Sequence, residues 1–121
     1  MGCCVAAKGA AETVTLYRGV AASHPGYANA LEGVAKPWGG HADSILHSLG
    51  DTKSVFTSWT TDLNVARGFA TNGGKEAGAL LTNTVPRTAT VSVPANVQMI
   101  MGESEVLMRG TVRGANVIPV R

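Results

Sequence analysis

The sequence has few charged and few aromatic residues. Only 15% of its 121 residues are charged and 5% are aromatic, whereas 45% are hydrophobic. A chain with so few charges and so many apolar residues can bury enough surface to fold, which argues against intrinsic disorder. The net charge of +2 permits a nucleic-acid partner but is too small to require one.

Cysteine is nearly absent. The two cysteines, Cys3 and Cys4, are adjacent, so they offer neither a disulfide across the fold nor the spaced cysteine pairs of a zinc site. The three histidines, His24, His41 and His47, also lack the spacing of metal ligands. We therefore expect no metal.

Long apolar runs are missing as well. No stretch reaches the roughly 18 apolar residues that a membrane-spanning helix needs. The sequence also does not open with the charged and then apolar segments of a signal peptide. These absences predict a soluble domain with no membrane partner.

The length of the chain suits one domain with a single core. Residues 1–12 consist mainly of small side chains that cannot build a packed element, so we interpret them as a linker or an artificial start. We assign residues 13–121 to the domain. Its many glycines, threonines and valines favour short strands and turns over long helices.

Short β-prone runs separated by Gly, Pro or polar residues predict most of the secondary structure. Strands are expected at residues 13–17, 54–60, 79–85, 89–93, 97–101, 105–108 and 117–120. The first of these strands should end just before Arg18, so that the guanidinium of Arg18 faces a cleft.

Two helices are predicted between the strands. One runs over residues 27–35, and the other starts at a cap on Thr61 or Asp62, continues to about Ala70 and stops before two glycines. Strands and helices do not alternate strictly, which disfavours a doubly wound parallel sheet. The predicted fold class is α+β, with packed antiparallel sheets.

Two acids stand out in the last third of the chain. Glu103 and Glu105 are the only carboxylates after residue 76, in a segment with four arginines. Side chains two residues apart share one face of a strand, and two carboxylates placed so closely repel each other. A site that handles a cation would explain this cost, whereas the alternative is a pair of solvated side chains on a surface strand.

The two acids become more specific evidence when they are considered together with two earlier motifs. In chain order, the sequence has aromatic-Arg-Gly at residues 17–19, Phe-x-Ser-aromatic-Thr at residues 56–60, and Glu-x-Glu at residues 103–105. In this order and shape, from about Val14 to Val120, the chain resembles the cholera-toxin-like mono-ADP-ribosyltransferases, whose motifs centre on Arg, Ser and Glu. The stretch at residues 54–60, with Asp62, Ala66 and residues 69–70 after it, is also similar to C-terminal toxin domains of bacterial Rhs-type polymorphic toxins.

The resemblance implies both a fold and an activity. The implied fold has two packed, mainly antiparallel β-sheets with a few short helices around an NAD cleft. The implied enzyme is an NAD-dependent ADP-ribosyltransferase, a pentosyltransferase that cleaves the nicotinamide–ribose bond and transfers ADP-ribose to a macromolecule. NAD is then a substrate, and no metal is needed.

The resemblance also assigns roles to individual residues. Glu105 would bind the nicotinamide-ribose hydroxyl and stabilise the developing positive charge, and Glu103 would orient or deprotonate the acceptor. Ser58 would position Glu105, and the forked guanidinium of Arg18 would meet the pyrophosphate. The expected NAD-binding residues are Tyr17, Arg18, Gly19, Ser58, Trp59, Thr60 and Glu105.

Trp59 is the departure from the family pattern, because many members have Thr there in a Ser-Thr-Ser triplet. Trp59 and Tyr17 are expected either to stack on the ligand or to pack in the protein.

The identity of the acceptor stays open at the level of sequence. The Glu-x-Glu form is associated with protein arginine, and related toxins that modify nucleic acids keep RNA as a second choice. The resemblance further implies a cognate immunity protein as a partner, delivery within a larger secreted protein, and action in the cytoplasm of a target cell. NAD glycohydrolysis and an inactive transferase-like binding module are the alternative functions.

Overall fold

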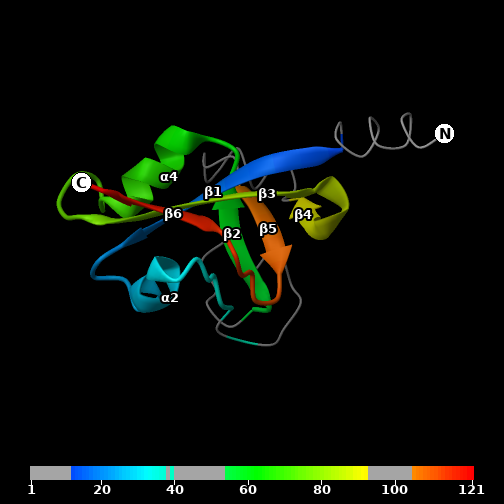
Figure 1. The fold of residues 1–121 in the computed structure, drawn as a ribbon, viewed down its shortest axis with the longest axis horizontal. Helices are drawn as coiled ribbons and strands as arrows, with labels where there is room; N and C mark the ends of the chain where they lie inside the picture. Colours follow the sequence, from blue (N-terminus) through cyan, green and yellow to red (C-terminus); the bar gives the residue numbers. More distant parts are fainter. Residues whose placement is uncertain (1–11, 38, 40–53, 93–104) are drawn as a thin grey trace.

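The computed structural model describes residues 12–37, 39, 54–92 and 105–121, and strands dominate this part of the chain (Figure 1). The elements are β1 (Thr13–Ala21), α2 (Tyr27–Leu31), β2 (Phe56–Thr60), α4 (Leu63–Ala70), β3 (Gly78–Pro86), the 3₁₀ turn η1 (Arg87–Ala89), β4 (Thr90–Ser92), β5 (Glu105–Arg109) and β6 (Asn116–Val120). The described strands form one six-stranded sheet in the order β4-β5-β2-β1-β3-β6, and each neighbouring pair is antiparallel. The α+β class and the antiparallel pairing are thereby confirmed, although the strands join in one sheet where two stacked sheets were expected.

The sheet consists of two halves that are joined weakly. In one half, β1 pairs with β3 along nine residue pairs, from Thr13 opposite Pro86 to Ala21 opposite Gly78. In the other half, β2 pairs with β5 along its full length. Between the halves, β1 and β2 share a single register pair, Tyr17 opposite Thr60. Arg18 directly follows this junction.

Helix α4 covers one face of the β1–β3 half. It begins where predicted, since the carboxylate of Asp62 accepts a hydrogen bond from the Asn64 amide at 2.9 Å and so caps the first turn. The helix backbone lies directly on two glycines of the sheet. A Cβ atom would come within 1.8 Å of the Ala66 carbonyl oxygen at Gly19, and equally close to that of Ala70 at Gly78. Only glycine fits at such contacts.

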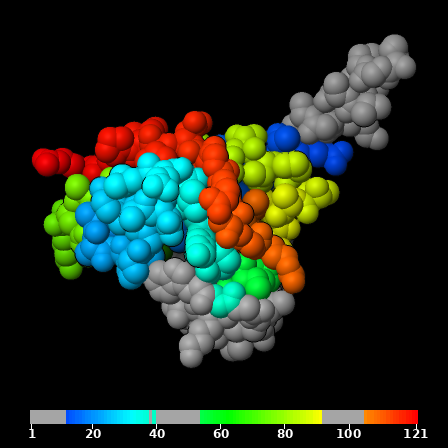
Figure 2. Space-filling model, turned by 60° about the horizontal axis from the view of Figure 1, so that its bottom comes forward, coloured from blue at the N-terminus to red at the C-terminus, as the bar shows by residue number. Residues whose placement is uncertain are grey.

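Helix α2 lies on the other side of the sheet from α4 (Figure 1). Its buried Ala30 belongs to the main core cluster, together with Leu16 and Val20 of β1. After α2, Ala35 forms a β-bridge with Val112 in the connection between β5 and β6. Figure 2 shows these two segments side by side on the face that comes forward, in cyan and orange.

The boundaries differ from the prediction at several elements. Strand β1 continues to Ala21, because Val20 and Ala21 remain buried and paired with β3. Helix α2 ends at Leu31, and Gly33 follows with a positive φ of 74°, a conformation that stops a helix. The strand predicted at residues 97–101 lies outside the described residues. Among the helices of the described part, none is long and apolar enough to cross a membrane.

Candidate functional site

Arg18 lies within β1 and not at its end, which corrects the sequence-based expectation. It stands opposite Leu81 of β3, where the pairing of the two strands is continuous. Burial lowers the pKa of its guanidinium to about 10, so the group is still charged at neutral pH. Its Nη1 donates a hydrogen bond of 2.9 Å to the main-chain oxygen of Ser58 in β2. Arg18 thus bridges the two halves of the sheet beside their single junction.

Ser58 and Glu105 meet on neighbouring strands. The register places Glu105 opposite Thr60 and Ser58 opposite Leu107, so Ser58 and Glu105 are diagonal neighbours on one face. The Ser58 hydroxyl donates to Oε2 of Glu105 at 2.5 Å, a length typical of a hydrogen bond to a charged carboxylate. Glu105 is only 6% exposed. A carboxylate buried in this way is costly unless its surroundings use its charge.

The three predicted central residues therefore form one connected chain of hydrogen bonds. Ser58 is the link, because its carbonyl oxygen accepts from Arg18 and its hydroxyl donates to Glu105. The two contacts use different groups of Ser58: the guanidinium meets the main-chain oxygen, whereas the carboxylate meets the side-chain hydroxyl. This arrangement keeps a cation and a carboxylate near one strand without pairing them directly. It can bind an anionic group on the arginine side and stabilise a developing cation on the carboxylate side.

Trp59 and Thr60 have structural partners. Trp59 is 2% exposed, belongs to the main core cluster, and donates its indole N–H to the Thr57 hydroxyl at 3.0 Å. Of the two expectations for Trp59, the structure favours packing over stacking on a ligand. The Thr60 hydroxyl accepts the Asp62 amide at 3.0 Å and helps to turn the chain into α4.

Tyr17 and Gly19 flank Arg18 on β1. Tyr17 is partly buried at the junction with Thr60. Gly19 has a packing reason of its own, because the main chain of α4 covers it. Binding of NAD by Tyr17, Gly19 or Thr60 stays a prediction.

Several predicted residues cannot be placed. Glu103, His41 and His47 lie outside the described residues, as do both cysteines. Within the described part, no group of three or more His, Cys, Asp or Glu side chains is arranged to hold a metal ion.

From the sequence, His24 is expected to be a loop residue rather than a catalyst, and one that could line the acceptor groove together with His41. It lies in the turn between β1 and α2, and its Nδ1 accepts the Gly26 amide at 2.8 Å. Partial burial lowers the pKa of its imidazole, and the positive charge of Arg18 lowers it further. In the sequence, the only indication of a relation to Arg18 is that His24 follows it by six residues, just past a strand. This spacing becomes informative only when the conformation of the turn is known.

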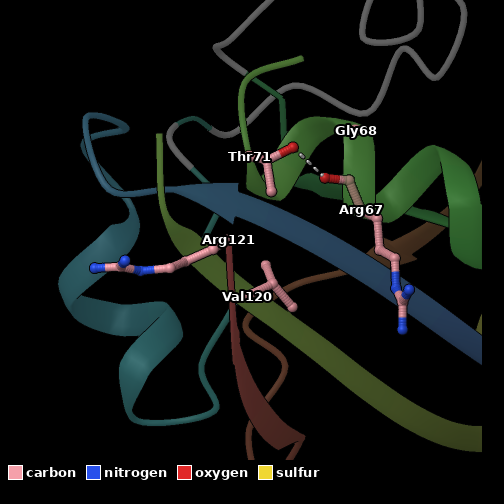
Figure 3. A pocket seen from close by; sticks show the side chains of 5 residues that line it. All are labelled: Arg67, Gly68, Thr71, Val120 and Arg121. Atoms are coloured by element: carbon pink, nitrogen blue, oxygen red, sulfur yellow. Dashed lines mark hydrogen bonds between the residues drawn. The ribbon is translucent and has the colours of Figure 1, made fainter. Parts of the chain in front are cut away.

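A hollow of about 360 Å³ lies elsewhere on the molecule, between α4 and the end of β6 (Figure 3). Its lining residues are Arg67, Gly68, Thr71, Val120 and Arg121. In Figure 3 the guanidinium groups of Arg67 and Arg121 point away from each other. The Thr71 hydroxyl is already engaged, since it donates to the Arg67 carbonyl at 2.9 Å. The hollow contains none of the predicted site residues.

Comparison with known proteins gives no independent assignment. The chain matches no protein-family model, and a search of curated proteins found no match. The geometry of the centre is therefore the main basis for a functional proposal.

Proposed function

We propose that this domain is an NAD-dependent mono-ADP-ribosyltransferase. The observation that carries the proposal is the hydrogen-bonded chain from Arg18 through Ser58 to Glu105. These are the three residues that the motif resemblance singles out, and they come from strands far apart in the sequence. The α+β class with antiparallel strands agrees with the proposal at the coarse level, although the described strands form one sheet.

The environment of Glu105 supports the carboxylate's proposed role. Cleavage of NAD breaks the bond between ribose C1′ and the nicotinamide nitrogen, and the electron pair leaves with a neutral nicotinamide. Positive charge then develops on the ribose. A buried carboxylate, fixed by a short hydrogen bond from Ser58, stabilises such a charge more strongly than a solvated one.

The environment of Arg18 supports binding of a pyrophosphate. The guanidinium keeps its charge at neutral pH, and the hydrogen bond to the Ser58 carbonyl occupies one of its five N–H donors. The remaining donors suit a phosphate oxygen pair. The acceptor then attacks C1′ and loses a proton to a carboxylate, the role that the resemblance gives to Glu103.

NAD consumption by purified protein is the direct test. We expect the wild type to release nicotinamide from NAD, and Glu105→Gln to reduce turnover by about 10²-fold or more, because the substitution removes the charge and keeps the shape. Gln at position 105 still accepts the Ser58 hydroxyl, so circular dichroism and thermal melting should remain similar to the wild type. A Glu105→Gln protein with full activity would contradict the mechanism.

A second experiment addresses the acceptor. We propose protein arginine first and RNA second, and expect label from NAD carrying a labelled adenylate to enter macromolecules of a cell lysate. Treating one portion with protease and another with nuclease then identifies the acceptor class. Free ADP-ribose as the sole product, even with lysate present, would indicate a glycohydrolase. Wild-type protein that neither consumes nor binds NAD would indicate an inactive binding module.

A further inference from the structure

The turn between α4 and β3 carries the only Asn-Gly pair of the sequence, Asn72 and Gly73. Both residues are exposed, and both have a positive φ, 50° at Asn72 and 68° at Gly73. Among the described residues other than glycine, Asn72 alone has this left-handed conformation, which asparagine tolerates better than most residues. The backbone of the turn therefore accounts for the residue types at both positions.

The side chain of Asn72 belongs to a hydrogen-bonded cluster around the carboxylate of Glu76. Nδ2 of Asn72 donates to Oε2 of Glu76 at 2.9 Å. Oε2 also accepts the Ser23 hydroxyl at 2.9 Å, and Oε1 accepts the Ser23 main-chain amide at 2.7 Å. We call these three residues the Glu76 clasp. Because Ser23 lies in the turn after β1, the clasp joins two turns at the same end of the β1–β3 pair.

An Asn-Gly pair can react with itself. The main-chain nitrogen of Gly73 attacks Cγ of Asn72, the new C–N bond closes a cyclic imide, and the Cγ–Nδ2 bond breaks. The side-chain nitrogen leaves as ammonia and takes the proton of the Gly73 amide with it. Water then adds to either carbonyl carbon of the imide and opens it to aspartate or isoaspartate. Glycine favours the attack because it has no Cβ to obstruct it.

The structure exposes the reacting groups and also restrains them. A Cβ atom at Gly73 would meet nothing within 4 Å, so water has access to the site. The Gly73 amide, however, donates to the Gly68 carbonyl at 2.9 Å, and Nδ2 of Asn72 is bound to Glu76. Both hydrogen bonds must break before the nitrogen attacks Cγ. The reaction in the folded protein is therefore slow and proceeds through local opening of the turn.

The product of this reaction cannot restore the clasp. Aspartate has no side-chain N–H to donate, and its carboxylate would lie against the carboxylate of Glu76, where like charges repel. Isoaspartate also lengthens the main chain of the turn. Either product loses the hydrogen bond from residue 72 and weakens the hold of Glu76 on Ser23.

We propose that Asn72 is a site of spontaneous deamidation, and that its conversion to aspartate or isoaspartate opens the Glu76 clasp between the turns after β1 and α4. The loss of ammonia makes the change irreversible in water, so the state of residue 72 records the age of the molecule. The inference is independent of the proposed enzymatic activity.

Ageing of the wild-type protein tests the site. The protein is incubated in mildly alkaline buffer, and peptide mapping by mass spectrometry detects the exchange of NH₂ for OH. We expect residue 72 to convert first. Asparagines that precede larger residues are internal references: Asn29, Asn64, Asn83 and Asn116. Asn72→Gly, which suits the positive φ, should lose the early modification. Conversion of a reference asparagine before Asn72 would overturn the proposal.

A second experiment tests the effect on the clasp. Asn72→Asp has the charge of one product from the start, and we expect it to melt a few degrees below the wild type at neutral pH. Asn116→Asp, an exposed position on β6, makes the same charge change and should melt close to the wild type. In a Glu76→Gln background, Asn72→Asp should cost much less, because no second carboxylate is present.

Amide exchange followed by NMR gives a local measurement of the same effect. The Ser23 amide, which donates to Glu76, should exchange several-fold faster in Asn72→Asp and in aged wild-type protein than in fresh protein. An Asn72→Asp protein with wild-type melting and Ser23 exchange would overturn the proposal. An equal loss of melting temperature in the Glu76 and Glu76→Gln backgrounds would also overturn it, because the clasp would then not be what deamidation breaks.

Discussion

At the scale of single residues, the arrangement of Arg18, Ser58 and Glu105 depends on the two roles of Ser58. Its carbonyl oxygen receives Arg18 and its hydroxyl holds Glu105, so one residue sets the position of a cation and of a carboxylate. The carbonyl contact survives most substitutions, whereas the hydroxyl contact depends on the side chain. Replacing the Ser58 side chain therefore tests the contact with Glu105 and leaves the contact with Arg18 in place.

Ser58→Ala should reduce NAD turnover by about 10-fold or more, because a hydrogen bond to a charged group contributes about 1.5–3 kcal/mol. Thr15→Ala is a suitable control, since it removes an exposed hydroxyl bond of 3.0 Å to Thr84 on the adjoining strands. Steady-state kinetics of both variants gives the comparison. Equal turnover of the two variants would argue against a positioning role for Ser58.

Glu76 predicts a dependence of stability on pH. Hydrogen bonds from the Asn72 side chain and from Ser23 lower its pKa below the ordinary value of 4.5. A lowered carboxyl pKa stabilises the folded state above that ordinary value, and the contribution is lost as the pH falls through the folded-state pKa.

We therefore expect Glu76→Gln to melt at a lower temperature than the wild type at neutral pH. The difference should shrink as the pH falls below 4.5 and through the lowered folded-state pKa, because the wild-type carboxylate then also becomes protonated. Thermal melting between about pH 3 and pH 7 measures the effect, and the exposed Glu32→Gln provides a control. A constant difference at every pH would contradict this account.

At the scale of elements, the contact of α4 with the sheet determines which positions tolerate change. Helix α4 was predictable from its cap and its apolar spacing, and Asp62 caps it as expected. The strands were predictable as short β-prone runs. The extension of β1 past Arg18 was not, because Gly19 weakens the local strand signal and only pairing with β3 reveals why glycine is required there.

Gly19→Ala should destabilise the fold by about 3 kcal/mol or more, because its Cβ would collide with the Ala66 carbonyl oxygen. Gly68→Ala is the contrasting variant. Gly68 lies within α4, and a Cβ there would meet nothing within 4 Å. Alanine at position 68 should stabilise the protein by about 0.5–1 kcal/mol through helix propensity. Urea unfolding of both variants measures the two changes, and equal destabilisation would refute the packing argument.

At the scale of the whole molecule, the strength of strand pairing is uneven. Nine residue pairs join β1 to β3, whereas one pair joins β1 to β2. The motif order in the sequence identified which residues belong together, but no local pattern specifies that their strands meet at one point. That junction arises from the order of strands in the sheet, which depends on contacts between segments far apart in the chain.

Hydrogen exchange should report this unevenness. We expect amides shared by β1 and β3 to be protected most strongly, and amides of β2 that face β1 to exchange faster. Exchange followed by NMR resolves single amides, with the β2–β5 pairs as an internal reference. Uniform protection across both sides of β2 would contradict a weak junction.

The two glycines beneath α4 can also help to identify related sequences. Arg, Ser and Glu motifs are short and occur by chance, so they identify distant relatives poorly on their own. Gly19 and Gly78 add a constraint that is independent of chemistry, because any chain that places a helix this close to two paired strands must have glycine at both positions. A search that requires both glycines at their spacing from the three motifs would separate true relatives of this domain from accidental matches.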